Sequence, residues 1–124
     1  MSTSKIFSLA AAVSGFLAVA LGAFGAHALK AQLEPSMMSV YQTSVQYHFW
    51  HTLALLGVGL YHQARPTRLS AWSGALILLG MLLFSGSLYL MAILDVRALG
   101  MITPIGGVTL LAGWLTLALA VWRS

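Results

Sequence analysis

Two histidines supply the most versatile chemistry in this chain. His48 and His51 lie three residues apart in an uncharged stretch. On one face of a helix this spacing lets two imidazoles share a zinc or copper ion, with His27 as a candidate third ligand. No carboxylate accompanies the pair, and two histidines on one helix cannot ligate opposite faces of a haem. The pattern leaves a metal or haem site open without specifying one, and we expect no cofactor.

The histidines belong to a wider set of polar side chains. At about 100° per residue, the polar residues of the segment around them fall within roughly a third of the helix circumference. Polar residues of the later apolar segments project to the same half of a membrane, as does His27 at the end of the first. The predicted intramembrane polar cluster is His27, Tyr41, Ser44, His48, His51, Thr52, Ser85, Ser87, Tyr89, Thr103 and Thr109.

Three interpretations of this cluster stay open. The side chains could hydrogen-bond across helices and fix their register. They could line a small polar pocket, open to the outer leaflet or the outer aqueous face, that binds a lipid headgroup, a quinone or another small amphiphile. They could also hold a metal or haem. Catalysis has little support and we assign no catalytic residue, because both carboxylates, Glu34 and Asp95, lie outside the apolar stretches.

The composition excludes a soluble globular domain. Of 124 residues, 60% are hydrophobic, six are basic and two are acidic, whereas a soluble domain carries about a quarter of its residues as charges. The basic residues stand singly rather than in a patch, which excludes nucleic acid as a partner. The chain has no cysteine, so it holds neither a disulfide nor a thiolate metal site.

The charges divide the chain into four uncharged stretches, each longer than the ~20 residues that cross a bilayer. Backbone groups must be satisfied within lipid, so we expect an all-α bundle of four transmembrane helices in one domain, residues 1–124. The predicted spans are residues 6–29, 40–63, 71–94 and 101–122, and Pro35 is expected to begin the second helix. Basic residues are more frequent at the end that holds both termini, which places the termini in the cytoplasm.

Small residues recur on one face of the first and last predicted helices. Ala18 and Gly22 belong to the first stripe, and Gly106 and Gly113 to the last. Such stripes let helices approach closely in lipid, where apolar contact alone gives little driving force. They indicate either packing within the chain or a homo-oligomer interface.

Gln42 and Gln46 lie on the face of the second helix opposite His48, together with Phe49 and Trp50. An amide inside the hydrocarbon layer should not face lipid. We therefore expect this helix to be contacted on two sides, either by neighbours within the bundle or by a partner subunit.

Four segments of the chain resemble a known family. They are Leu21–Leu29, Tyr41–Ala54, Phe84–Tyr89 and Ile102–Gly107. They look like family four-two-three of the domains of unknown function, which comprises small bacterial inner-membrane proteins and has a mitochondrial-type eukaryotic relative. The resemblance implies a multi-pass protein of the bacterial inner (plasma) membrane with four helices, and it brings no activity or site.

We predict a non-enzymatic binding or assembly protein. Its outer-half polar pocket would contact membrane lipid, a small amphiphile or a membrane-protein partner. The alternative is a small transporter or enzyme, or a metal-binding or haem-binding protein, that uses His27, His48 and His51.

Overall fold

The computed structural model describes all residues from Met1 to Ser124, and every regular element is a helix. Four long helices are present, as the sequence predicts: α1 (Thr3–Phe24), α2 (Pro35–Ala64), α3 (Arg68–Leu94) and α4 (Thr103–Trp122). Two short elements extend them. A π-helical turn, Gly25–Leu29, continues α1, and a 3-10 helix, Arg97–Met101, precedes α4.

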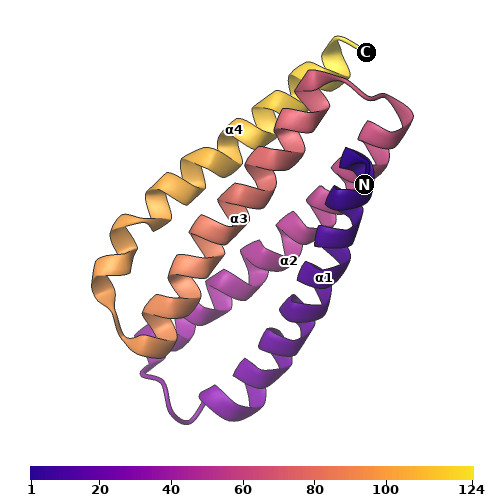
Figure 1. Cartoon of the computed structure of the whole chain (residues 1–124). Coiled ribbons are helices and arrows are strands. Elements are labelled where there is room, and N and C mark those ends of the chain that lie inside the picture. Colours follow the sequence, from indigo (N-terminus) through magenta and orange to yellow (C-terminus); the bar gives the residue numbers. More distant parts are fainter.

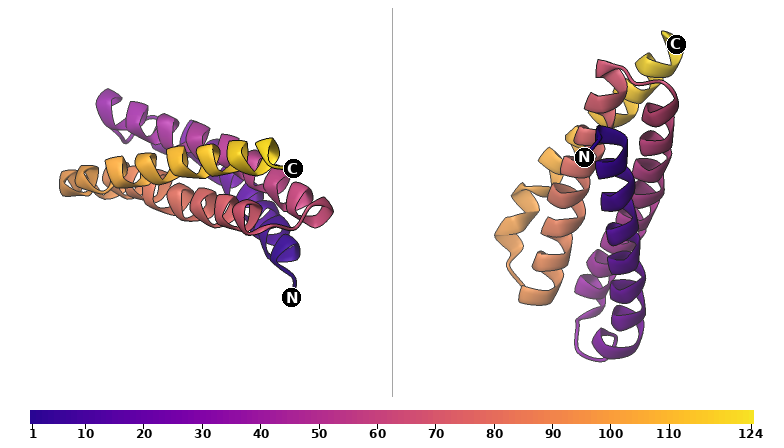
Figure 2. Two further views of the ribbon diagram at one scale, coloured as in Figure 1. Left: turned by 90° about the horizontal axis from the view of Figure 1, so that it is seen from above. Right: turned by 45° about the vertical axis from the view of Figure 1, so that its right-hand side comes forward.

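The helices form two antiparallel hairpins that lie side by side (Figure 2). α1 and α3 run in one direction and α2 and α4 in the other, so both termini and the connection between α2 and α3 lie at one end (Figure 1). Extensive packing joins consecutive helices only: α1 with α2, α2 with α3, and α3 with α4. α2 and α3 are therefore central, and α1 and α4 lie on the two outer sides.

Local sequence explains where the helices begin and end. The Ser2 hydroxyl accepts a hydrogen bond from the Lys5 backbone N–H and caps α1. α2 begins at Pro35, as predicted, because its missing N–H is no loss in the first turn. Thr67 and Ser70 form a reciprocal capping box at the start of α3. That helix ends at Asp95, whose φ of 55° is left-handed.

Three segments are long and apolar enough to cross a membrane: Thr3–Leu29, Arg68–Leu94 and Arg97–Trp122. α2 is missing from this set although it is the longest helix. The reason lies in its polar residues, which lower its mean hydropathy. Ser44, His48, His51 and Thr52 are buried against the neighbouring helices, whereas others, such as Gln42, are exposed.

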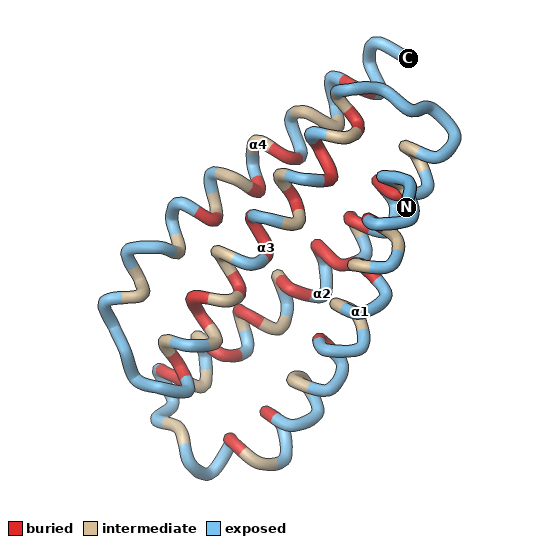
Figure 3. The backbone as a smooth tube through the Cα atoms, viewed as in Figure 1, coloured by how far each residue is buried: buried red, intermediate tan, exposed pale blue.

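Burial follows the lines where helices meet, and outward surfaces are exposed (Figure 3). The largest core cluster includes Phe7, Leu55, Ile77 and Leu110, with one or more residues from each helix. Many of the outward residues are large and apolar, and Phe16 is 74% exposed. An exposed apolar surface around buried serines and histidines is the arrangement expected for a protein whose solvent is lipid.

The small-residue stripe of α4 packs within the chain. A Cβ atom on Gly106 would collide with the backbone of Phe84, and one on Gly113 would lie 2.7 Å from Ile77 Cγ1. α3 and α4 therefore approach more closely than side chains at these two positions would allow. Of the predicted packing residues of α1, Ala18 is buried, and Gly22 leaves ordinary contact distance to Val45 of α2.

Candidate functional site

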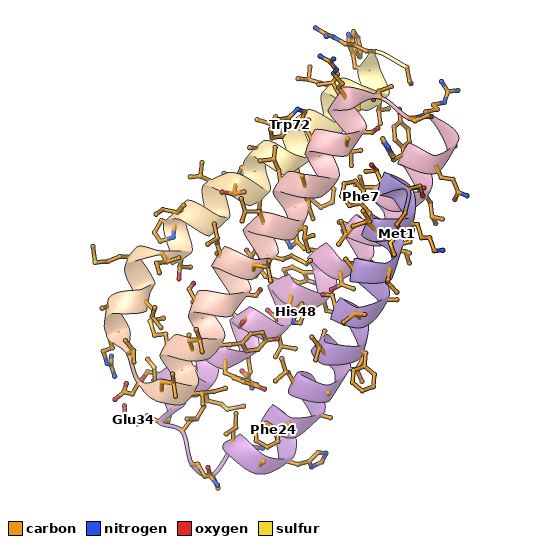
Figure 4. The ribbon with its side chains drawn as sticks, in the orientation of Figure 1. Met1, Phe7, Phe24, Glu34, His48 and Trp72 are labelled. Carbon is orange, nitrogen blue, oxygen red and sulfur yellow. The ribbon has the colours of Figure 1, made fainter.

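His48 lies on α2, between α1 and α3 (Figure 4), at the centre of a hydrogen-bonded chain that joins three helices. Its Nε2 lies 2.8 Å from Ser14 Oγ on α1, and its Nδ1 lies 2.9 Å from the Tyr89 hydroxyl on α3. Ser14 Oγ is also 2.6 Å from Thr52 Oγ1, one turn further along α2. We call Ser14, His48, Thr52 and Tyr89 the His48 chain.

One direction of these hydrogen bonds satisfies every donor. The Met81 sulfur can only accept, and the Thr52 hydroxyl donates to it over 3.9 Å. Ser14 then donates to Thr52, and its oxygen accepts from the Nε2–H of His48. The unprotonated Nδ1 of His48 accepts from the hydroxyl of Tyr89. The oxygens of Tyr89 and Ser14 keep unused lone pairs.

His51 has a separate environment on the α4 side of α2. Its Nδ1 lies 2.8 Å from the Tyr47 carbonyl oxygen, which can only accept. The Trp114 indole N–H donates to its Nε2 at 3.0 Å. These partners require a neutral imidazole with the proton on Nδ1, whereas His48 carries its proton on Nε2. Both ring nitrogens of His51 are therefore committed to structural hydrogen bonds.

The other predicted polar residues form pairs rather than one cluster. Ser44 and Ser85 each donate to the backbone carbonyl of the other, at 2.6 and 3.1 Å, and so link α2 to α3. Ser87 Oγ lies 2.6 Å from Thr103 Oγ1 and links α3 to α4.

Two further residues of the predicted cluster bond to backbone carbonyls. Tyr41 donates to Leu21 of α1, and Thr109 bonds only to Ile105 of its own helix. The predicted cluster is thus divided among several helix contacts, because equal depth does not bring side chains together when they face different neighbours.

The structure places His27 apart from the other histidines. It lies exposed on the π-helical turn after α1, and no three metal-binding side chains gather anywhere in the chain. This corrects the set of His27, His48 and His51 as candidate ligands. The carboxylates are also remote, because Glu34 and Asp95 form exposed ion pairs with Arg97 at one end of the molecule.

A groove between α1 and α3 opens above the His48 chain. Its volume is about 560 Å³, within the usual range for small-molecule sites. The walls are aliphatic, with Leu9, Val13 and Leu17 on α1 and Leu78 and Leu82 on α3. The polar groups that reach it are Ser14, His48, Ser85 and Tyr89, and no charged side chain lines it. Several wall residues are strongly exposed, so the groove opens outward, toward lipid.

Sequence reasoning missed the two residues that give the histidines their partners. Ser14 lies within an apolar segment beside Gly15, and Trp114 lies among leucines. Ser14 could have been found from the sequence, because a single hydroxyl halfway along an apolar segment needs a hydrogen-bond partner on another helix. Trp114 was overlooked because it lies in an apolar run, although a buried indole N–H also needs a hydrogen-bond partner.

The sequence of this chain matches a known protein family. A family described as "Protein of unknown function (DUF423)" matches residues 21–107. The chain belongs to this family. The matched segment holds His48, His51 and Tyr89, and Ser14 lies before it. The resemblance seen in the sequence is thereby confirmed.

Members of the family with similar sequences are membrane proteins. The chain is 46% identical over 112 residues to the UPF0382 inner membrane protein YgdD of Escherichia coli (strain K12), covering 90% of this chain and 86% of the relative. It is 42% identical over 119 residues to a UPF0382 membrane protein of Staphylococcus epidermidis, covering 96% and 97%. No solved structure matches the chain. This protein is therefore a multi-pass protein of the bacterial inner (plasma) membrane, as predicted.

Proposed function

We propose that this family member is a non-enzymatic binding protein that takes an uncharged, hydroxyl-bearing amphiphile from the membrane into the groove between α1 and α3. The observation that carries the proposal is the groove itself, with its aliphatic walls and polar floor. Its α1 wall runs from Ile6 to Leu21, about 22 Å at the helical rise, which exceeds the thickness of one leaflet. One lipid chain fits along it.

The floor favours a ligand that donates a hydrogen bond. Tyr89 gives its proton to His48, so its hydroxyl oxygen keeps a lone pair with which it can accept a hydrogen bond beside the groove. No lysine or arginine lines the groove to balance a phosphate. The α-amino group of Met1 lies at the far end of the α1 wall, because Met1 precedes Ser14 by 13 residues, about 20 Å at the helical rise. A neutral hydroxyl headgroup, such as that of diacylglycerol, matches this chemistry, and phosphatidic acid does not.

The same proposal includes the membrane topology: all four helices cross, and both termini are cytoplasmic. α1 and α3 run in the same direction, so the chain between them has to return across the membrane (Figure 1). The exposed surface of α2 carries large apolar residues such as Trp50 and Leu53, as a helix surrounded by lipid and by other membrane helices requires. Lys5, Arg65, Arg68 and Arg123 lie at the end with the termini.

Photo-crosslinking in vesicles tests the ligand. Diacylglycerol and phosphatidic acid with the same photoreactive chain are compared, and diacylglycerol is expected to label the α1 and α3 walls. Leu82→Trp should fill the groove and abolish labelling. Leu111→Trp is the matched control, because both leucines are 65% exposed and Leu111 lies on α4, away from the groove. Equal labelling by phosphatidic acid overturns the headgroup assignment, and labelling that survives Leu82→Trp overturns the groove.

A reporter fused after Ser124 tests the topology. An alkaline phosphatase fusion should be inactive and a fluorescent protein fusion bright, because both reporters would be cytoplasmic. The reverse pattern contradicts the proposed orientation.

A further inference from the structure

Two glutamines of α2 are exposed on the outside of the protein. The side-chain amides of Gln42 and Gln46 make no hydrogen bond within the chain, and both residues are exposed. At the helical rise they lie about 12 and 18 Å along α2 from Glu34, the charged residue at that end of the helix. A primary amide offers two donors and an acceptor, and lipid chains offer it no partner. Neighbours within the bundle do not cover these amides, so a molecule outside the chain must.

The glutamines belong to a continuous stripe. Exposed residues follow one another along the outer face of α2 at alternating steps of four and three, and they are Gln42, Gln46, Phe49, Leu53, Leu56, Leu60 and Gln63. This spacing is the seam along which two helices pack at a shallow crossing angle. The seam is apolar at its centre and carries amides at both ends. It faces away from α3 and the groove, so the inference is independent of the proposed ligand.

We propose that the seam binds a second copy of this chain, with the two α2 helices parallel about a two-fold axis along the membrane normal. Two copies inserted in the same orientation place Gln42 opposite Gln42 and Gln46 opposite Gln46, at equal depth. An amide is self-complementary, because each side chain both donates and accepts. A lipid phosphate is a poorer occupant, since it only accepts and the seam has no cation to balance its charge.

The surface beside the glutamines is shaped to receive a partner. A hollow of about 430 Å³ lies between α1 and α2, and its lining includes Gln42, Gln46, Gly22 and Ala26. Small residues at this edge let the backbone of a second helix come close, and the amides on the other edge can bond across it. The stripe of α4, by contrast, is already occupied by α3.

Disulfide crosslinking maps the contact directly, because the chain has no cysteine of its own. Leu53→Cys and Leu56→Cys should form disulfide-linked dimers when membranes are oxidised with copper phenanthroline. Leu111→Cys is the control on an exposed face of α4 and should stay monomeric. Equal crosslinking at all three positions, or none at Leu53 and Leu56, overturns the seam.

Dimer dissociation in vesicles measures what the amides contribute. Gln46→Leu should raise the dimer dissociation constant by about 3- to 30-fold, which corresponds to about 0.6–2 kcal/mol for a hydrogen bond between membrane helices. The constant is measured by counting subunits through photobleaching while the protein is diluted with lipid. Gln32→Leu, in the exposed connection before α2, is the matched control and should change nothing. Because both positions are exposed, helix content by circular dichroism should stay at the wild-type value. A wild-type protein that counts as monomeric, or a Gln46→Leu dimer as tight as wild type, rejects the proposal.

Discussion

His48 and His51 are three residues apart, and the sequence predicts both on the same buried face of α2. In the structure their surroundings differ. His48 faces an open groove, and its partners Ser14 and Tyr89 are hydroxyls that can donate or accept. His51 is held between a carbonyl that only accepts and an indole that only donates. The two histidines therefore have different roles. The hydrogen bonds of His48 can rearrange around a ligand, whereas those of His51 can only hold α4 against α2.

A buried cation should separate the two sites most strongly. His51→Lys puts an ammonium group against Trp114, where nothing can neutralise it, and should lower the free energy of unfolding by about 3 kcal/mol. His48→Lys should lower it by less, because the lysine side chain can extend along the open groove. Thermal unfolding in detergent compares the variants. Equal losses would mean that the groove is closed in solution.

Filling two glycines tests the tight and open sides of α3. Gly106→Leu drives a side chain into the backbone of Phe84 and should reduce stability by about 2 kcal/mol. Gly86→Leu, on the groove side, has nothing within 4 Å of its added Cβ and should stay within about 0.5 kcal/mol of wild type. Thermal unfolding in detergent measures the stability of both variants. A tolerated Gly106→Leu would show that α4 is not packed as described.

Removing one donor from each histidine is a subtler comparison. Trp114→Phe leaves the Nε2 atom of His51 buried without a partner and should reduce stability by about 1.5 kcal/mol. Tyr89→Phe leaves Nδ1 of His48 beside the groove, where a ligand or water can replace the lost hydroxyl, and the loss should be about 0.5 kcal/mol. Chemical unfolding followed by helix circular dichroism measures the two. If Tyr89→Phe proves the more damaging change, the His48 chain is structural.

The smallest effect is expected at the ends of the two hairpins. Arg97 lies 4.0 Å from Glu34 and 3.5 Å from Asp95, and all three side chains are at least 63% exposed. Such pairs are screened by solvent, so Arg97→Ala should change stability by less than about 0.5 kcal/mol. Melting temperatures at low and high salt check this. A large salt-dependent loss would show that the connections, and not the helix contacts, hold the hairpins together.

Much of the fold could be predicted because its causes are local. Single charges interrupt the apolar stretches, and Pro35 marks the start of α2 because its missing N–H is no loss in the first turn. Helical periodicity also assigned His48 and Gln46 to opposite faces of α2. Periodicity cannot say which helix meets which face, and so it missed Ser14 and Trp114 as partners. It also joined Thr109 to a site although that hydroxyl turns back to its own helix.

The bond between Ser14 and His48 bears on how the protein is made. Synthesis delivers α1 to the membrane first, and the least apolar helix, α2, follows while α3 is still inside the ribosome. At that moment the polar face of α2 has no neighbour except α1, whose Ser14 hydroxyl meets both His48 and Thr52. On the proposed topology, Ser14 therefore gives the newly made α2 its first hydrogen-bond partner in lipid, before Tyr89 and Ser85 arrive on α3.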